Sequence, residues 1–336
     1  MTLHVRAADS RDADAITALL LGDARYRESL NSNLWAVAPD AEQRVRASLG
    51  TISEPVTGPF THHWIVAEEG RVLRGVVHAL NVPPPPLFDL DGGNAGVLLD
   101  DCHFSSDERA STALLETAER VLAEAGAVLF VAASPVDWID RTAFLQAAGY
   151  EPTTLYMAKS NIAAVPSVYE RVRFATSADL GRIVQLSALH RAQLKAASPQ
   201  FWNVHDEADE RFAGWMAVTL TLPDRAMFVV TGATDEVNGF IVAQPGSPLH
   251  LTAAHDLARV GLIDDFHARA FEPSWAAGEP SGEPAALLVA AETQLGSRGA
   301  EVALAICPVR MTRKVELLLA AGYAPANVWM IKSTLL

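Results

Sequence analysis

Apolar residues recur along the chain at two spacings, and these predict helices that alternate with strands. Ser10 has the features of a helix N-cap, and Ile16 and Leu19 follow it at helical spacing. Two apolar runs within 63–80, separated by a turn, predict a pair of antiparallel strands. The run 128–132 is apolar without alternation. This pattern is typical of a strand that is buried on both faces beside a parallel neighbour.

The same pattern returns in the second part of the chain. The segment QAAGYEP at 146–152 returns as LAAGYAP at 319–325, and LLDDCH at 98–103 returns as LIDDFH at 262–267. Each pair of segments has the same order of helix end, turn or strand, and the pairs occur in the same order along the chain. The sequence therefore predicts that one fold occurs twice.

Each copy contains, in order, a strand, two helices, antiparallel strands, a helix, a strand, a helix and a final strand. This order is typical of an α/β (α+β) domain in which helices flank a central mixed sheet. We predict an N-terminal domain over 1–160, a linker over 161–167 and a C-terminal domain over 168–336, and we expect the two domains to superpose. Gly149 and Gly322 are expected to end a helix in each copy, in a left-handed conformation.

Composition narrows the class of protein. The chain has 336 residues, enough for two domains, and a formal net charge of −14. This charge opposes binding to nucleic acid and favours amine-bearing ligands. No apolar run is long enough to span a membrane and no signal peptide precedes the first strand, so we expect a cytoplasmic protein. Cys102 and Cys307 stand at non-equivalent places, so we expect neither a disulfide nor a metal site.

The order of elements and the two Ala-Ala-Gly-Tyr helix ends resemble the GNAT superfamily of acyl-CoA-dependent N-acyltransferases, in a tandem form that spans the whole chain. The resemblance implies that acetyl-CoA serves as co-substrate in a cleft where the central strands part. Its pyrophosphate would lie on the loop that begins the long helix, where backbone N–H groups and a helix N-terminus favour an anion. The acceptor would be a small-molecule amine, and the protein a monomer or a homodimer.

The phosphate-binding loop of this family is degenerate here. The first half has no glycine and two acids at 105–112, whereas the second half has two glycines, two prolines and two glutamates at 275–285. Asp137 and Asp140 of the first half are replaced by basic residues in the second. We therefore expect CoA in the second half. The candidate residues there are Arg269, Trp275, Gly278, Gly282, Arg310, Arg313 and Lys314.

Candidate catalytic residues come from the repeated Asp-Asp-x-His segment. Strand alternation places Asp265 and His267 on one face of a strand that, by resemblance, lines the acyl group. Either side chain could take the proton from an attacking amine. The alternative is structural, with the aspartate capping the strand and His267 packed at its end. The tyrosine that acts as general acid in many GNAT enzymes is replaced by Leu145 and Leu318, while Tyr150 and Tyr323 are expected in the core.

Two functions remain open from the sequence. The first is an N-acyltransferase, with acetyl the expected acyl group, whose second half is active. The second is a catalytically inactive GNAT-fold protein that binds a small molecule or a partner. The degenerate loop and the missing tyrosine favour the second function. The Asp-Asp-x-His segment, the basic cluster and the glycines of one half favour the first, which we take forward.

Overall fold

The computed structural model describes residues 2–52, 58–162, 171–272 and 282–334. Its first half contains β1 (Leu3–Ala7), α1 (Ala13–Leu30), α2 (Ala41–Ser48), β2 (Thr61–Glu69), β3 (Val72–Val82), β4 (Asn94–Leu98), α3 (Glu108–Glu124), β5 (Ala127–Pro135), α4 (Ile139–Ala147) and β6 (Glu151–Ser160). The predicted linker 161–167 lies largely outside the described residues, and the domain boundaries stay a prediction.

The second half repeats this order. It contains β7 (Val172–Phe174), α5 (Leu180–Ala197), α6 (Ala208–Thr219), β8 (Ala226–Thr231), β9 (Val237–Pro245), β10 (Val260–Ala268), α7 (Glu283–Ser297), β11 (Val302–Pro308), α8 (Thr312–Ala320) and β12 (Ala324–Ser333). The predicted mixed sheet flanked by helices is thus confirmed for each half. Among the described residues, no helix is both long enough and apolar enough to cross a membrane.

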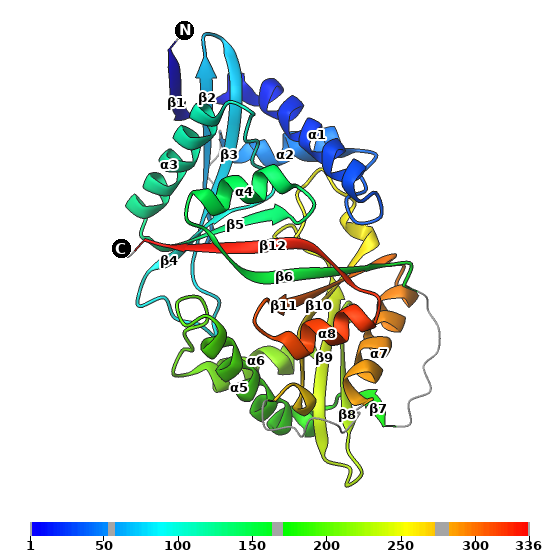
Figure 1. The fold of residues 1–336 in the computed structure, drawn as a ribbon. Coiled ribbons are helices and arrows are strands. Elements are labelled where there is room, and N and C mark those ends of the chain that lie inside the picture. Colours follow the sequence, from blue (N-terminus) through cyan, green and yellow to red (C-terminus); the bar gives the residue numbers. More distant parts are fainter. Residues whose placement is uncertain (1, 53–57, 163–170, 273–281, 335–336) are drawn as a thin grey trace.

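The final strands of the two halves are exchanged, which the sequence analysis did not predict. β12 lies between β5 and β6, and β6 pairs on its other side with β11. The two sheets are therefore joined into one 12-stranded sheet in the order β1-β2-β3-β4-β5-β12-β6-β11-β10-β9-β8-β7. Figure 1 shows β12 and β6 crossing the middle of the molecule side by side.

Matching ion pairs accompany this exchange. Lys332 of β12 reaches Glu119 of α3 at 2.7 Å, and Lys159 of β6 reaches Glu292 of α7, also at 2.7 Å. Each lysine therefore joins the last strand of one half to the long helix of the other. Because both carboxylates are largely buried, each depends on its lysine for compensation of its charge.

Helices cover both faces of the sheet because successive strand residues point to opposite sides. In β2, Ile65 and Ala67 pack in one core with α3, whereas Trp64 and Val66 pack in another with α1 and α2. The second half repeats the arrangement, with α7 and α8 on one face and α5 and α6 on the other. The predicted core tyrosines Tyr150 and Tyr323 are each 2% exposed.

The helix ends predicted from the repeated glycines are confirmed. Gly149 has a φ of +92° and Gly322 a φ of +89°, a left-handed conformation that glycine adopts without a steric penalty. Each of these turns leads directly into an exchanged strand, β6 after Gly149 and β12 after Gly322.

The proline-rich loop of each half crosses to the other half. His255, in the loop between β9 and β10, forms an isolated antiparallel β-bridge with Val37 of the first half. Phe88, in the loop between β3 and β4, forms the same kind of bridge with Val204 of the second half. Each loop therefore contacts the opposite half of the chain, so these contacts between the halves are reciprocal.

The exchanged strands predict a testable stability effect. Replacing Lys159 or Lys332 by Met leaves a buried glutamate without its charged partner, so the free energy of unfolding should fall by about 2 kcal/mol in each variant. Chemical denaturation measures this change. As a control, Arg120→Met breaks the exposed pair Arg120–Glu124 and should cost less than about 1 kcal/mol. Equal losses in all three variants would contradict a special role for the exchanged lysines.

Candidate functional site

The two strands of the parallel pair part from each other in each half. β4 and β5 pair as far as Leu98 and Ala132, and β10 and β11 as far as Ile263 and Ala305. Beyond these residues β5, β10 and β11 continue without pairing across the gap. A slot therefore opens at the carboxyl ends of the parallel strands, where α/β sheets commonly bind ligands.

Arg141 of α4 fills the slot of the first half. Its guanidinium donates one hydrogen bond to Cys102 O at 2.6 Å and two, each of 3.3 Å, to Leu99 O and Ala133 O. The residue is 4% exposed. Because Arg141 bridges carbonyls that follow β4 to a carbonyl of β5, the slot has no free backbone acceptors at these positions.

Lys314 of α8 occupies the matching place in the second half but leaves it open. Its ammonium donates one hydrogen bond, of 3.0 Å, to Phe266 O, and the residue is 1% exposed. Burial lowers the pKa of Lys314, while Cys307, Asp265 and Asp264 act in the opposite direction. A single cationic head thus stands at the base of the second slot.

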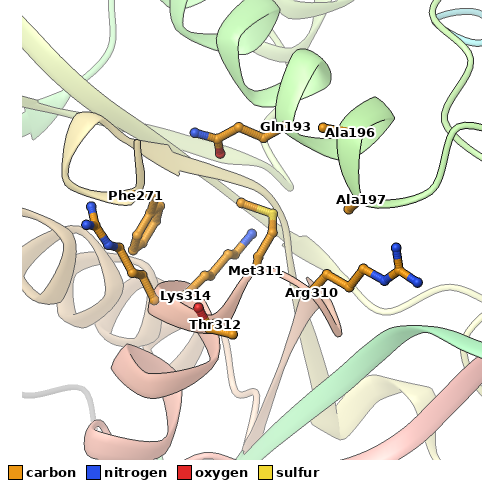
Figure 2. Close-up of a pocket in the computed structure, with 9 residues that line it drawn as sticks. Gln193, Ala196, Ala197, Phe271, Arg310, Met311, Thr312 and Lys314 are labelled. Carbon is orange, nitrogen blue, oxygen red and sulfur yellow. The ribbon is translucent and has the colours of Figure 1, made fainter. Parts of the chain in front are cut away.

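A cavity of about 480 Å³ adjoins Lys314. Figure 2 shows Gln193 of α5 facing, across this space, the segment that carries Met311 and Lys314. The side-chain oxygen of Gln193 is buried and has no partner among the described residues, so it can accept a hydrogen bond from a ligand. Two further cations lie at the edge. The residues around the cavity are Gln193, Ala196, Ala197, Phe271, Arg310, Met311, Thr312, Arg313 and Lys314.

Asp265 lies in a bulge of β10. The register with β9 shifts between Ile263 and Phe266, so the bulge interrupts the alternation on which the prediction of a shared face for Asp265 and His267 rests. Burial, and then the neighbouring Asp264, raise the pKa of Asp265 to about 7. A carboxyl with a pKa in this range is suited to general-base catalysis at neutral pH.

The side chain of His267 is buried and has no access to solvent. It is 0% exposed, and its ring stacks on that of His190 with centroids 5.2 Å apart. Neither ring nitrogen has a hydrogen-bond partner among the described residues, and Glu272 Oε1 is 4.0 Å from Nε2. Burial, and then Lys314, lower the pKa of His267 to about 3. Of the two predicted bases, Asp265 is the one with a pKa near neutral pH, and neither of the two is among the residues that line the cavity.

Comparison with solved structures identifies the fold. A tandem GNAT protein from the clavulanic acid biosynthesis pathway, solved without AcCoA, superposes with a TM-score of 0.53 at 12% identity over 99% of this chain and 98% of that one. A GCN5-related N-acetyltransferase from Sphaerobacter thermophilus gives 0.60 at 15% identity over 98% and 95%. The chain has a tandem GNAT fold. No protein-family model matches the sequence, and no curated protein does.

The other residues predicted to bind CoA are Arg269, Trp275, Gly278 and Gly282. Arg269 begins a short 3₁₀ helix, Arg269–Phe271, and Gly282 is the N-cap residue of α7. Neither lines the described cavity. Trp275 and Gly278 lie outside the described residues. Of the predicted set, the structure brings together Arg310, Arg313 and Lys314.

The first GNAT half holds a polar cluster that the sequence analysis missed. Asp101 Oδ2 lies 2.6 Å from His78 Nδ1, and His78 Nε2 lies 2.9 Å from His62 Nδ1. The three side chains line a second cavity, of about 460 Å³. A comparison of the two copies in the sequence could have indicated this cluster, because the residue at the position of His78 differs between them. His78 pairs with Trp64 across β2 and β3, whereas the matching pair across β8 and β9 is Met227 and Val242.

Buried histidines predict how the stability of this GNAT fold depends on pH. Burial lowers the pKa of His190, His250, His255 and His267, so these rings stay neutral in the folded protein, while the unfolded chain binds protons below about pH 6.5. Their contribution to stability is therefore complete above about pH 6.5 and is lost as the pH falls below it.

The free energy of unfolding should accordingly decrease between pH 7 and pH 5, and His267→Leu should make this decrease smaller by up to about 1.4 kcal/mol per pH unit. Denaturant titrations across the pH range measure it. Phe271→Leu removes comparable packing near His267 without removing a titratable group, so it should keep the parent's pH dependence. An unchanged pH dependence in His267→Leu would show that this ring is protonated equally in both states.

Proposed function

We propose that this protein is an N-acyltransferase that moves an acyl group, with acetyl the expected one, from acyl-CoA to the amine of a small molecule. The observation that carries the proposal is the open, cation-lined cavity at the slot of the second half. An N-acyltransferase activity is compatible with the tandem GNAT fold. We place the acyl-CoA in the second half because Arg141 fills the corresponding slot of the first.

Positive charge supports this placement. Acyl-CoA carries a pyrophosphate, and a chain with a net charge of −14 can hold it only where cations gather. Arg310 and Arg313 border the cavity beside the N-terminus of α8, whose helix dipole adds positive potential. Arg313 also donates a 2.6 Å hydrogen bond to Glu272 O, which ties α8 to the segment after β10.

The reaction would use Asp265 and Lys314. The amine nitrogen bonds to the acyl carbon while the carbon–sulfur bond breaks, and Asp265 takes the proton that the nitrogen loses. The ammonium of Lys314 stabilises or protonates the departing thiolate, a role that the missing tyrosine would otherwise fill. Lys314 interacts electrostatically with Asp265, so both groups belong to one charged cluster.

Charge reversal tests the cofactor site. We expect the double variant Arg310→Asp, Arg313→Asp to bind acetyl-CoA more weakly by about 1 kcal/mol or more, measured by calorimetric titration, because two cations beside the phosphates are replaced by anions. The control Arg11→Asp, Arg120→Asp makes the same change in net charge at two exposed positions. Equal affinity in the parent and the cavity variant, or a complex with CoA in the first half, would refute the placement.

The pH profile tests the base. Acyl transfer should increase with pH through about 7, because Asp265 must lose its proton first, and Asp265→Asn should reduce the rate by about a hundredfold or more. Asp264→Asn should move the rising limb to lower pH, because it removes a neighbouring negative charge that raises the pKa of Asp265. If both variants keep the parent's rate and profile, Asp265 is not the base. Failure of acetyl-CoA to bind at all would instead favour the inactive, ligand-binding alternative.

A further inference from the structure

The second cavity, in the first half, is built from both halves of the chain. Its floor contains Leu80 of β3, Leu99 after β4 and Trp329 of the exchanged β12, and its opposite wall is the loop 247–253. This loop crosses from the second half and is held there by hydrogen bonds such as that from Ala38 N to Ala254 O, at 2.9 Å. The cavity volume of about 460 Å³ is within the range of small-molecule sites.

A chain of hydrogen bonds leads from the sheet to this cavity. Burial acts to raise the pKa of Asp101, but the charge and hydrogen bond of the neighbouring His78, with smaller contributions, outweigh it, so the pKa is lowered and the ionised carboxylate can only accept. His78 therefore donates from Nδ1, and in its neutral form Nε2 carries a lone pair that accepts from His62 Nδ1. This order of donors leaves the lone pair of His62 on Nε2, available to a ligand.

The hydrogen-bonded chain is held rigidly. The ring of Trp64 stacks on His78 with centroids 4.0 Å apart and planes 6° from parallel, and Trp64 Nε1 donates to Thr51 Oγ1 at 2.8 Å. Burial, and then His78, lower the pKa of His62, which keeps its ring neutral at pH 7. The second oxygen of Asp101, Oδ1, is buried with no partner among the described residues.

The cluster is specific to the first half. Val242 and Met227 stand where His78 and Trp64 would be, although Asp265 matches Asp101. The hydrogen-bonded chain is therefore not a feature that both copies share for stability. The slot beside it is closed by Arg141, so the ligand of this cavity is not expected to be an acyl-CoA.

We propose that this cavity is a second small-molecule site, which binds an apolar molecule of one or two rings that donates one N–H or O–H hydrogen bond to Nε2 of His62. Leu80, Leu99, Leu251 and Trp329 form an apolar part of the lining that suits the rings of such a molecule. The hydrogen bond to His62 Nε2 fixes the orientation of the bound molecule. The site is separate from the acyl-CoA site and does not depend on acyl transfer.

A pair of isosteric probes tests this proposal on the full-length protein. 1-Naphthylamine and 1-methylnaphthalene have the same shape, but only the amine donates a hydrogen bond. By calorimetric titration at pH 8, the amine should bind about fivefold to tenfold more tightly, because a buried hydrogen bond is worth about 1 kcal/mol. Equal affinities, or no binding of either probe, would overturn the proposal.

Variants locate the hydrogen bond. In His62→Leu the preference for the amine should disappear, while His63→Leu, which changes the adjacent residue on the opposite face of β2, should keep it. Saturating CoA, which carries no acyl group, should leave the amine affinity unchanged. Competition by CoA, or a preference that persists in His62→Leu, would place the amine elsewhere.

A measurement on the unaltered protein avoids any folding defect of the variants. In ¹⁵N spectra of the histidine side chains, the amine should shift the Nε2 resonance of His62, and 1-methylnaphthalene should not. Identical spectra with both probes would contradict the assignment even if the variants fail to fold.

Discussion

The pairing of β12 with both β5 and β6 is the constraint on which the rest of the structure depends. Strand pairing satisfies backbone groups that would otherwise be left without partners in the centre of the sheet. Because each half completes its sheet with the other half's last strand, neither half is closed alone. The pairs Lys332–Glu119 and Lys159–Glu292 add charge compensation at the same junction. The exchange also fixes where the two slots and the crossing loops lie relative to each other.

Because the two halves have the same order of elements, side chains at matching positions can be compared directly. Arg141 and Lys314 occupy matching places, yet the guanidinium reaches three carbonyls and the ammonium one. The planar, forked head of arginine can bridge both strands of the slot, whereas lysine presents a compact charge at a single point. This one difference in side-chain geometry closes the first slot and leaves space beside the second.

The local features of the fold were predictable from the sequence, and the long-range ones were not. Gly149 and Gly322 were predictable because a left-handed turn depends on the residue that occupies it. The exchange was not predictable, because the segments MAKS and MIKS in β6 and β12 have the same apolar pattern and suit either sheet. Asp265 could be proposed from its own segment. The contact between His78 of β3 and Asp101, which follows β4, joins residues 23 positions apart, and the spacing of apolar residues does not predict it.

The two halves have diverged in complementary directions. In the first half Arg141 fills the slot, and the hydrogen-bonded histidines lie in the cavity beside it. In the second half the apolar Val242 stands at the position of His78, so the hydrogen bond that Asp101 receives from His78 has no counterpart from this position of β9. Burial then raises the pKa of Asp265, whereas His78 lowers that of Asp101. The second aspartate of the repeated Asp-Asp segment therefore has a lowered pKa in the first half and a raised pKa in the second.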